Sequence, residues 1–343
     1  MINYNTIAFA SILFAAIILP LFVSFIFGGW VAKITSPSYS IKKIPSLKGK
    51  WALVTGTNTG IGYVTVRELA RKGANVIATS RSLEKGKIAE SKLMKELNGT
   101  IDVGTIEYIE LDLASIKNIK NFANKVKSKV KTIDMIILNA GIMMTPFGLT
   151  DDGFELQIGT NHLGHFTLIK LLNDIIKRSK SRIVTVSSCA HEGPYPEGGI
   201  IFDSFTSNYS YNSLYAYGQS KLANILFANE LASRFNGTGV TSNSLHPGMI
   251  KTELGRYVEE QIKKSFVLTL FSPIFALFNT AMMDPNAGAL TQLYVATAPE
   301  LKDVTGKYFQ PIAKEGKVSL LAQNITLQKE LWEYSEKLIK NKI

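Results

Sequence analysis

The stretch LYAYGQSKLAN, residues 214–224, contains two tyrosines and one lysine whose spacing could support acid–base chemistry. The pattern predicts a helix, and residues four apart in a helix lie one above the other. Tyr217 and Lys221 then face the same way, whereas Tyr215 points elsewhere. An ammonium beside a phenol favours the phenolate and lowers its pKa from about 10 toward neutrality. Tyr217 is therefore a candidate general acid/base, although the same spacing is also typical of a solvated helix face.

A glycine-rich turn, TGTNTGIG, follows one predicted strand and precedes a predicted helix. Its glycines would let the backbone approach a pyrophosphate, whose charge the N-terminus of the helix would meet. Three residues separate the first two glycines, so the spacing differs from the older dinucleotide fingerprint. The turn nevertheless predicts a site for cofactor phosphates, made by Gly56, Thr57, Asn58, Thr59, Gly60, Ile61 and Gly62.

The end of the second predicted strand distinguishes between the nicotinamide cofactors. An NAD site would place Asp or Glu there to hold the ribose hydroxyls, but this chain has Thr79, Ser80 and Arg81. Arg81 could form a planar, charge-assisted contact with a 2′-phosphate. The sequence therefore favours NADP(H) as the cofactor, and the alternative is a surface arginine beside the strand.

The elements that must position these residues alternate between short β-branched runs and amphipathic stretches of helical length. The runs begin at residues 51, 75, 106, 134, 182 and 240, and two clear helical stretches cover 63–71 and 83–97. This order predicts an α/β fold with a single doubly wound parallel sheet of about seven strands and helices on both faces. Ligands then bind at the carboxyl ends of the strands.

Composition limits the possible classes of protein. The chain has 343 residues, a formal charge of +11 and 46% hydrophobic content, which is ample for a sizeable core. Its basic residues are dispersed, so we expect no nucleic-acid partner. A single cysteine, Cys189, excludes an intrachain disulfide. No metal-ligand pattern joins His162, His165 and His246, which we interpret as structural, and we expect no metal site.

The N-terminal segment predicts a membrane anchor. Residues 7–30 contain no charge and are long enough to cross about 30 Å of hydrocarbon. Pro20 is compatible with a kinked span or a hairpin, and a buried helix of the domain is the alternative. Basic residues follow this segment and none precedes it, which predicts a cytosolic domain. We expect an anchor at residues 1–32, a linker at 33–48 and a catalytic domain at 49–343, at the endoplasmic reticulum or a lipid droplet.

Seven motifs in order make the chain similar to a known family. They are TGTNTGIG at 55, LDLAS at 111, LNAG at 138, TNHLGHF at 160, VSS at 186, YGQSK at 217 and HPGMIKTEL at 246. Together they resemble the short-chain dehydrogenase/reductase family, which has a Rossmann-type fold. The motifs NHLGHF and HPGMIKTEL are similar to those of the branch that contains the retinol dehydrogenases and the WW-domain oxidoreductase. The resemblance extends from about residue 48 to the C-terminus.

The resemblance implies roles for a catalytic set. Tyr217 would exchange the proton, and Lys221 would lower its pKa and hold the nicotinamide ribose. Ser188 would bind the substrate oxygen, because strand alternation points Ser187 to the other side. Asn161 would support a water-mediated proton relay to the lysine.

The family also implies further cofactor contacts along the carboxyl edge of the sheet. One departure is Tyr63, which stands where many members of this branch have a lysine. The implied cofactor residues are Asp112, Leu113, Asn139, Ala140, Gly141, Pro247, Gly248 and Thr252, together with Tyr217 and Lys221.

A second apolar segment, residues 265–283, predicts the substrate region. Pro273 divides it, and we interpret it as a helical lid over an apolar pocket, with a pair of core helices as the alternative. With Met143, Met144 and the loop at 191–195 it favours a lipophilic carbonyl or alcohol, with a slight preference for a retinoid-like one. We expect NADP(H)-dependent carbonyl reduction.

Two expectations concern assembly and the alternative function. The family often pairs through the helices that carry Asn161 and Tyr217, which would make a homodimer. A scaffold or sensor that binds NADP without turnover is the alternative to an enzyme, but it has no physical need of Asn161, Ser188, Tyr217 and Lys221 together.

Overall fold

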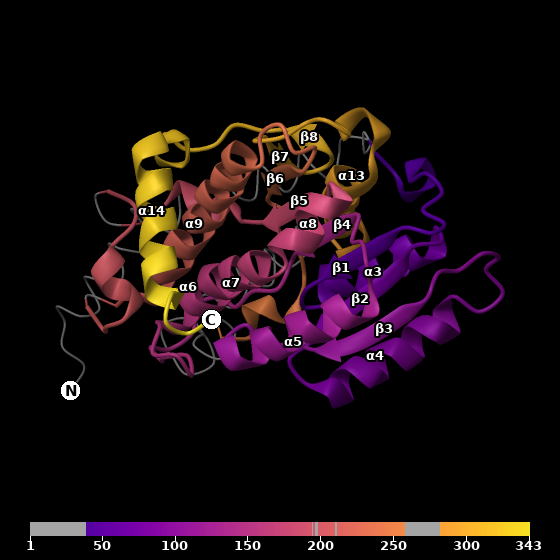
Figure 1. The fold of residues 1–343 in the computed structure, drawn as a ribbon, viewed down its shortest axis with the longest axis horizontal. Helices are drawn as coiled ribbons and strands as arrows, with labels where there is room; N and C mark the ends of the chain where they lie inside the picture. Colours follow the sequence, from indigo (N-terminus) through magenta and orange to yellow (C-terminus); the bar gives the residue numbers. More distant parts are fainter. Residues whose placement is uncertain (1–38, 194, 196–197, 210, 258–281) are drawn as a thin grey trace, which may run out of the picture.

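The computed structural model describes residues 39–193, 195, 198–209, 211–257 and 282–343 (Figure 1). These residues form one eight-stranded sheet in the order β3-β2-β1-β4-β5-β6-β7-β8. Neighbouring strands are parallel except for the antiparallel pair β7 and β8. The strands are β1 (Trp51–Val54), β2 (Asn75–Ser80), β3 (Ile106–Glu110), β4 (Met135–Leu138), β5 (Arg182–Val186), β6 (Thr241–Leu245), β7 (Tyr308–Gln310) and β8 (Lys314–Glu315).

All six predicted runs form strands, which confirms the parallel α/β sheet. The predicted stretches 63–71 and 83–97 are helical as well, with α3 beginning three residues earlier at the glycine-rich turn. The main helices are α3 (Gly60–Arg71), α4 (Leu83–Glu96), α5 (Ile116–Lys129), α7 (Gly164–Leu171), α8 (Asn173–Ser179), α9 (Ser213–Arg234), α13 (Pro285–Thr297) and α14 (Ile325–Ile339).

The strands are buried on both faces because helices cover each side of the sheet. In β1, Leu53 packs into one hydrophobic core while Ala52 and Val54 pack into the other, and none of the three is exposed. The first core contains side chains of α5, α7, α9 and α14, and the second contains side chains of α3, α4 and α13. This arrangement is the doubly wound sheet that continuous apolar strands predict.

Helix α14 lies on the outside of α7 and α9 (Figure 1). The Trp332 ring lies 4.8 Å from the Phe166 ring, and the His162 Nε2 atom lies 2.8 Å from the Ser335 hydroxyl. The Lys170 ammonium pairs with Glu336 at 2.5 Å. Part of the helical surface through which pairing of two copies is expected is therefore covered by this chain's own C-terminal helix.

Two apolar segments of the sequence fall outside the described residues. The expected anchor and the first part of the linker belong to residues 1–38, and most of the expected lid belongs to residues 258–281. None of the helices within the described ranges combines the length and the apolar character needed to cross a bilayer.

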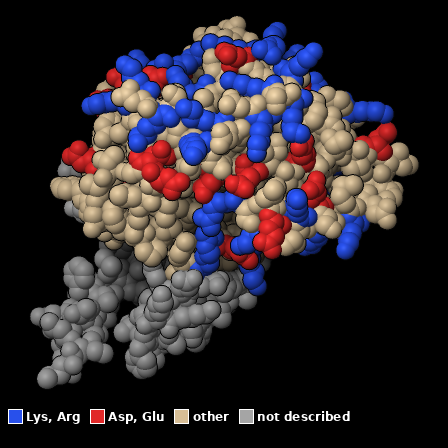
Figure 2. Space-filling model, turned by 60° about the horizontal axis from the view of Figure 1, so that its bottom comes forward, with Lys and Arg blue, Asp and Glu red and all other residues tan. Residues whose placement is uncertain are grey.

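Charged side chains are distributed over the surface in Figure 2. Lys and Arg side chains are interspersed with Asp and Glu and with uncharged areas on this face. The charge of +11 is thus not gathered into one stripe in this view.

Candidate active site

Helix α9 places Tyr217 and Lys221 on one buried face. Its first turn is fixed by Asn212, whose side chain accepts hydrogen bonds from Leu214 N and Tyr215 N. Tyr217 is 5% exposed and Lys221 is 3% exposed, and the ammonium lies 5.7 Å from the centre of the phenol ring. Tyr215 remains half-buried. The shared face is therefore confirmed, and the solvated alternative is wrong.

Burial dominates the pKa values of this pair. It raises the pKa of Tyr217 above the ordinary value of 10.0, and the neighbouring Ser188 side chain opposes the rise. Burial lowers the pKa of Lys221 from 10.5 to about 8. The expected lowering of the Tyr217 pKa by Lys221 is not observed, because loss of water around the phenol outweighs the neighbouring charge.

The two serines at the end of β5 have opposite orientations. The Ser187 hydroxyl is buried and donates to the Lys221 carbonyl at 2.6 Å, so it anchors α9 to the sheet. The Ser188 side chain is partly exposed, accepts a hydrogen bond from Ala190 N and lies close enough to the Tyr217 hydroxyl to influence its pKa. Strand alternation thus predicted correctly which of the two serines lies beside the tyrosine.

The Lys221 ammonium lies at the end of β5, next to the residue that precedes the two serines. Its nitrogen donates to the Val186 carbonyl at 3.3 Å, and Asn224 Nδ2 donates to the same oxygen at 3.1 Å. A single shared carbonyl is a poor replacement for water around a buried ammonium, which accounts for the lowered pKa.

Asn161 lies in a π-helical turn, Gly159–Leu163, directly before α7. Its Oδ1 accepts from Ile142 N at 2.8 Å, and its Nδ2 donates to the Ile142 carbonyl and the Ser220 hydroxyl. A β-carbon built on Gly141 would lie 3.3 Å from both Asn161 Oδ1 and Lys221 Nζ. The two groups therefore border one space beside Gly141, and π-turns of this kind are frequent at functional sites.

The glycine-rich turn brings β1, β4 and α3 into close backbone contact. Gly56 has a φ of +69°, and a β-carbon there would lie 2.8 Å from Ala140. A β-carbon on Gly62 would lie 2.5 Å from Asn139 Nδ2 and closer still to the Gly56 carbonyl. Glycine at positions 56 and 62 is thus required for the close packing of this turn, which leads into the N-terminus of α3, where a pyrophosphate is favoured.

We predict that Gly62→Ala lowers cofactor affinity by tenfold or more and destabilises the fold by about 1–3 kcal/mol, because the added methyl group pushes α3 away from the turn. Isothermal titration with NADPH and thermal unfolding would measure the two effects. Gly148→Ala is the matched control, since its nearest neighbour would be Leu156 at 3.8 Å. Equal affinity of both variants for NADPH would contradict the assignment of this turn.

A hydrogen-bond chain that the sequence did not predict links this turn to Asn161. The Thr55 hydroxyl accepts from Asn139 N and Ala140 N, and it lies 2.9 Å from His165 Nε2. His165 Nδ1 lies 3.0 Å from the Asn161 carbonyl. Burial lowers the pKa of His165 to about 4, so the ring is neutral and serves the structural role expected for it.

The remaining predicted cofactor residues lie along the same edge of the sheet. Thr57 N donates to the Thr79 carbonyl, which fixes the turn against β2. Arg81 is exposed and forms no hydrogen bond or ion pair with other described residues. Asp112 Oδ1 accepts from Ala114 N and orders the loop after β3 that includes Leu113.

The segment after β6 approaches the glycine-rich turn. Gly248 has a φ of +93°, and its amide donates to His246 Nδ1. A β-carbon on Gly60 would lie 3.2 Å from the Thr252 methyl group. Pro247 and its neighbours therefore lie on the same side of the sheet as the predicted phosphate site.

The predicted substrate residues lie on two loops beside the catalytic set. Met143 and Met144 are half-buried just after Gly141, and Met144 N donates to Gln157 Oε1. On the other loop His191 is fully buried, with its Nδ1 atom 2.7 Å from the Ser188 carbonyl. The sequence did not predict this contact between His191 and Ser188. It forms because a 3₁₀ turn, Cys189–Glu192, follows Ser188 directly.

Comparisons with known proteins agree with this arrangement. Residues 50–263 match the short chain dehydrogenase family. Human retinol dehydrogenase 14 is 40% identical over 304 residues, covering 85% of this chain and 87% of the relative. Human retinol dehydrogenase 13 is 42% identical over 296 residues, covering 86% of each.

Solved structures share the fold. An uncharacterized protein from Mycobacterium paratuberculosis has a TM-score of 0.68 and 33% identity, covering 89% of this chain and 98% of that one. The RhlG/NADP active-site complex of Pseudomonas aeruginosa has a TM-score of 0.58 and 21% identity, covering 81% and 98%.

The chain belongs to the short-chain dehydrogenase/reductase family of oxidoreductases. Within the family it resembles the retinol dehydrogenase branch.

Proposed function

We propose that this protein is an NADP(H)-dependent oxidoreductase that interconverts a lipophilic carbonyl compound and its alcohol. The substrate is retinal/retinol-like or another lipid aldehyde or ketone. The observation that carries the proposal is the shared burial of Tyr217 and Lys221, whose ammonium lies 5.7 Å from the centre of the phenol ring, with Ser188 beside the phenol. Reduction of a carbonyl to an alcohol needs both a proton donor and a second hydrogen-bond partner at the substrate oxygen.

The geometry gives each side chain a task in carbonyl reduction. NADPH, when bound, supplies the hydride that the carbonyl carbon accepts. Tyr217 donates its proton to the carbonyl oxygen, and Ser188 hydrogen-bonds that oxygen while negative charge develops on it. Lys221 in its charged form stabilises the Tyr217 phenolate that remains. Asn161 holds the turn beside Gly141 and borders the space through which a proton returns to Lys221.

The residues of the carboxyl edge fit a nicotinamide dinucleotide. The tightly packed glycine-rich turn places amide groups at the N-terminus of α3, where a pyrophosphate is favoured. Arg81 at the end of β2 is available for a 2′-phosphate, which supports NADP(H) over NAD(H). Cytosolic NADP is kept largely reduced, so we propose that the reaction runs toward the alcohol.

We predict that Arg81→Ala raises the KM for NADPH by about 10- to 100-fold, because a charge-assisted contact is worth about 1.5–3 kcal/mol. The KM for NADH should change little, since NADH has no 2′-phosphate. Initial rates with each cofactor at a fixed aldehyde concentration would measure both values. Arg178→Ala is the control, because Arg178 is also exposed but lies on α8. An equal rise for both cofactors would refute the role of Arg81.

The substrate class is supported by the names of the relatives and by the residues beside the catalytic set. Two relatives are named retinol dehydrogenases, and Met143 and Met144 add an apolar wall beside Gly141. Methionine side chains adapt to irregular apolar ligands. A screen of NADPH oxidation by the full chain against all-trans-retinal, long-chain aldehydes and steroid ketones tests this proposal. Turnover of small polar carbonyls alone would overturn it.

We also propose that residues 1–32 anchor the protein with its catalytic domain facing the cytosol. The absence of basic residues before the apolar segment and their abundance after it support this orientation. The chain offers an internal reporter, because the asparagines of four glycosylation sequons are exposed on the domain. A shift in gel mobility on glycosidase treatment would reverse the orientation. The four are Asn98, Asn208, Asn236 and Asn324.

A further inference from the structure

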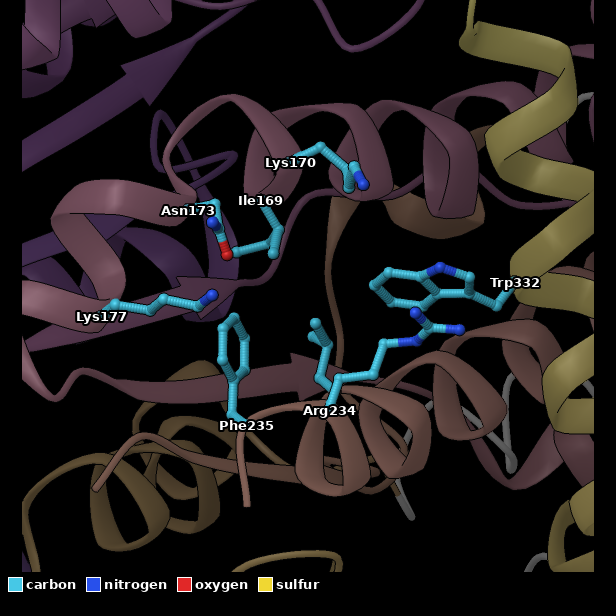
Figure 3. Close-up of a pocket in the computed structure, with 8 residues that line it drawn as sticks. Ile169, Lys170, Asn173, Lys177, Arg234, Phe235 and Trp332 are labelled. Atoms are coloured by element: carbon cyan, nitrogen blue, oxygen red, sulfur yellow. The ribbon is translucent and has the colours of Figure 1, made fainter. Parts of the chain in front are cut away.

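A cavity of about 380 Å³ opens between α7, α8, the end of α9 and α14 (Figure 3). None of the catalytic or cofactor residues lines it. Leu231 in its wall follows Tyr217 by fourteen residues on the same helix, which separates them by about 20 Å along the axis. The cavity is therefore distinct from the candidate active site, and its volume is in the range of small-molecule pockets.

Three cations from three different elements line the cavity: Lys170, Lys177 and Arg234. Two of them already have carboxylate partners, because Lys170 pairs with Glu336 at 2.5 Å and Arg234 pairs with Glu230 at 2.7 Å. The Glu230 and Glu336 side chains thus leave the local balance at one positive charge.

The unmatched charge belongs to Lys177. Its ammonium pairs with no carboxylate in the described part of the chain, and it lies 6.0 Å from the centre of the Phe235 ring. The Arg234 guanidinium lies only 4.2 Å from the centre of the Trp332 ring, and this cation–π contact holds the arginine side chain in place. An anion entering the cavity would therefore find one free cation and two held in place.

Apart from the Asn173 side chain, the remaining walls of the cavity are apolar. Ile169, Phe235 and Trp332 are 2%, 5% and 6% exposed, and Figure 3 shows the two rings beside the lysine and arginine heads. A small hydrated anion such as phosphate gains nothing from these three apolar side chains. A molecule with a negative head and an apolar body could satisfy both parts of the cavity.

We propose that this cavity binds a small anionic amphiphile, a carboxylate on an alkyl or aryl body, independently of catalysis. The carboxylate would lie against the Lys177 ammonium, and the apolar body would lie beside the exposed parts of the Phe235 and Trp332 rings. The proposal does not depend on the proposed oxidoreductase activity, and its test needs no turnover.

Trp332 makes the cavity directly observable, since it is one of three tryptophans in the chain. Octanoate added to the detergent-solubilised full chain should produce a saturable change in tryptophan fluorescence. The change should disappear in Trp332→Phe, which identifies the reporter. The neutral analogue 1-octanol and inorganic phosphate should each bind at least tenfold more weakly than octanoate.

Variants separate this cavity from general attraction to a basic surface. Lys177→Gln should weaken octanoate binding about tenfold, whereas Lys180→Gln, exposed three residues away and outside the cavity lining, should not. Phe235→Leu should weaken octanoate but not phosphate. Tyr217→Phe should leave octanoate binding unchanged, so a loss there would place octanoate in the active site and overturn the proposal. Equal binding by Lys177→Gln and Lys180→Gln, or equal binding of phosphate and octanoate, would overturn it as well.

Discussion

Tyr217→Phe is expected to lower kcat for carbonyl reduction by about 10²- to 10⁴-fold, the range that a positioned general acid contributes. The substitution removes only the hydroxyl oxygen, so the ring should continue to fill the buried face of α9. The affinity for NADPH should remain near the wild-type value. NADPH oxidation with a substrate found in the carbonyl screen would measure kcat, and titration with NADPH in the absence of substrate would measure binding.

Tyr215→Phe provides the matched control for this experiment. It loses the same atom two residues away, on the same helix, from a side chain that is half-buried and turned from Lys221. Its turnover should equal that of the wild type. Unchanged turnover in Tyr217→Phe would refute the catalytic assignment. NADPH binding without turnover by the wild type, across the whole substrate screen, would favour the scaffold alternative.

The repeat of helices and strands along the sequence predicted the relative orientation of site residues that lie on one element. The helical period placed Tyr217 beside Lys221, and the strand period separated Ser188 from Ser187, both as observed. The carboxyl ends of successive strands met at one edge because parallel strands must do so. The short strands β7 and β8 were not predicted individually, since three and two residues are too few to show a period.

Features that depend on distant segments could not be predicted in this way. The direction of the Tyr217 pKa shift is set by how completely other elements enclose α9, and no residue near Tyr217 in the sequence records this. The Thr55 to His165 contact joins residues 110 apart. The contact between the Trp332 and Phe166 rings likewise requires the C-terminal helix to pack against α7, which no local pattern specifies.

The pH dependence of catalysis is expected to report on Lys221. Burial lowers its pKa to about 8, so the ammonium is charged below that pH and neutral above it. Only the charged form stabilises the Tyr217 phenolate that proton donation produces. We therefore expect kcat/KM for carbonyl reduction to be level below about pH 7 and to fall about tenfold per pH unit above pH 8.

Neighbouring groups do not titrate in this window. The pKa of His165 is lowered to about 4 by burial, so its ring stays neutral throughout. Burial raises the pKa of Tyr217 and of Cys189, and both stay protonated as the pH passes through 8. A fall in kcat/KM near pH 8 can accordingly be assigned to Lys221, and a profile that stays level to pH 10 would contradict the assignment.

Lys221→Met should lower kcat/KM by about 10²-fold or more and remove the fall near pH 8, because no ammonium remains to titrate.

The stability of the wild-type protein should change with pH in the opposite sense to its activity. The folded-state pKa of Lys221 lies below its unfolded value, so the unfolded chain binds this proton more tightly and stability rises with pH between about 8 and 10.5. Removing the buried charge removes that cost, and the Tm of Lys221→Met at pH 7 should not be lower than that of the wild type. Thermal unfolding of both proteins across this pH range measures the difference; a large drop in Tm would show that Lys221 stabilises the fold and that the loss of activity reflects unfolding. An inactive variant of undiminished Tm is the expected result, because a buried cation with one shared carbonyl partner serves the reaction at the expense of the fold.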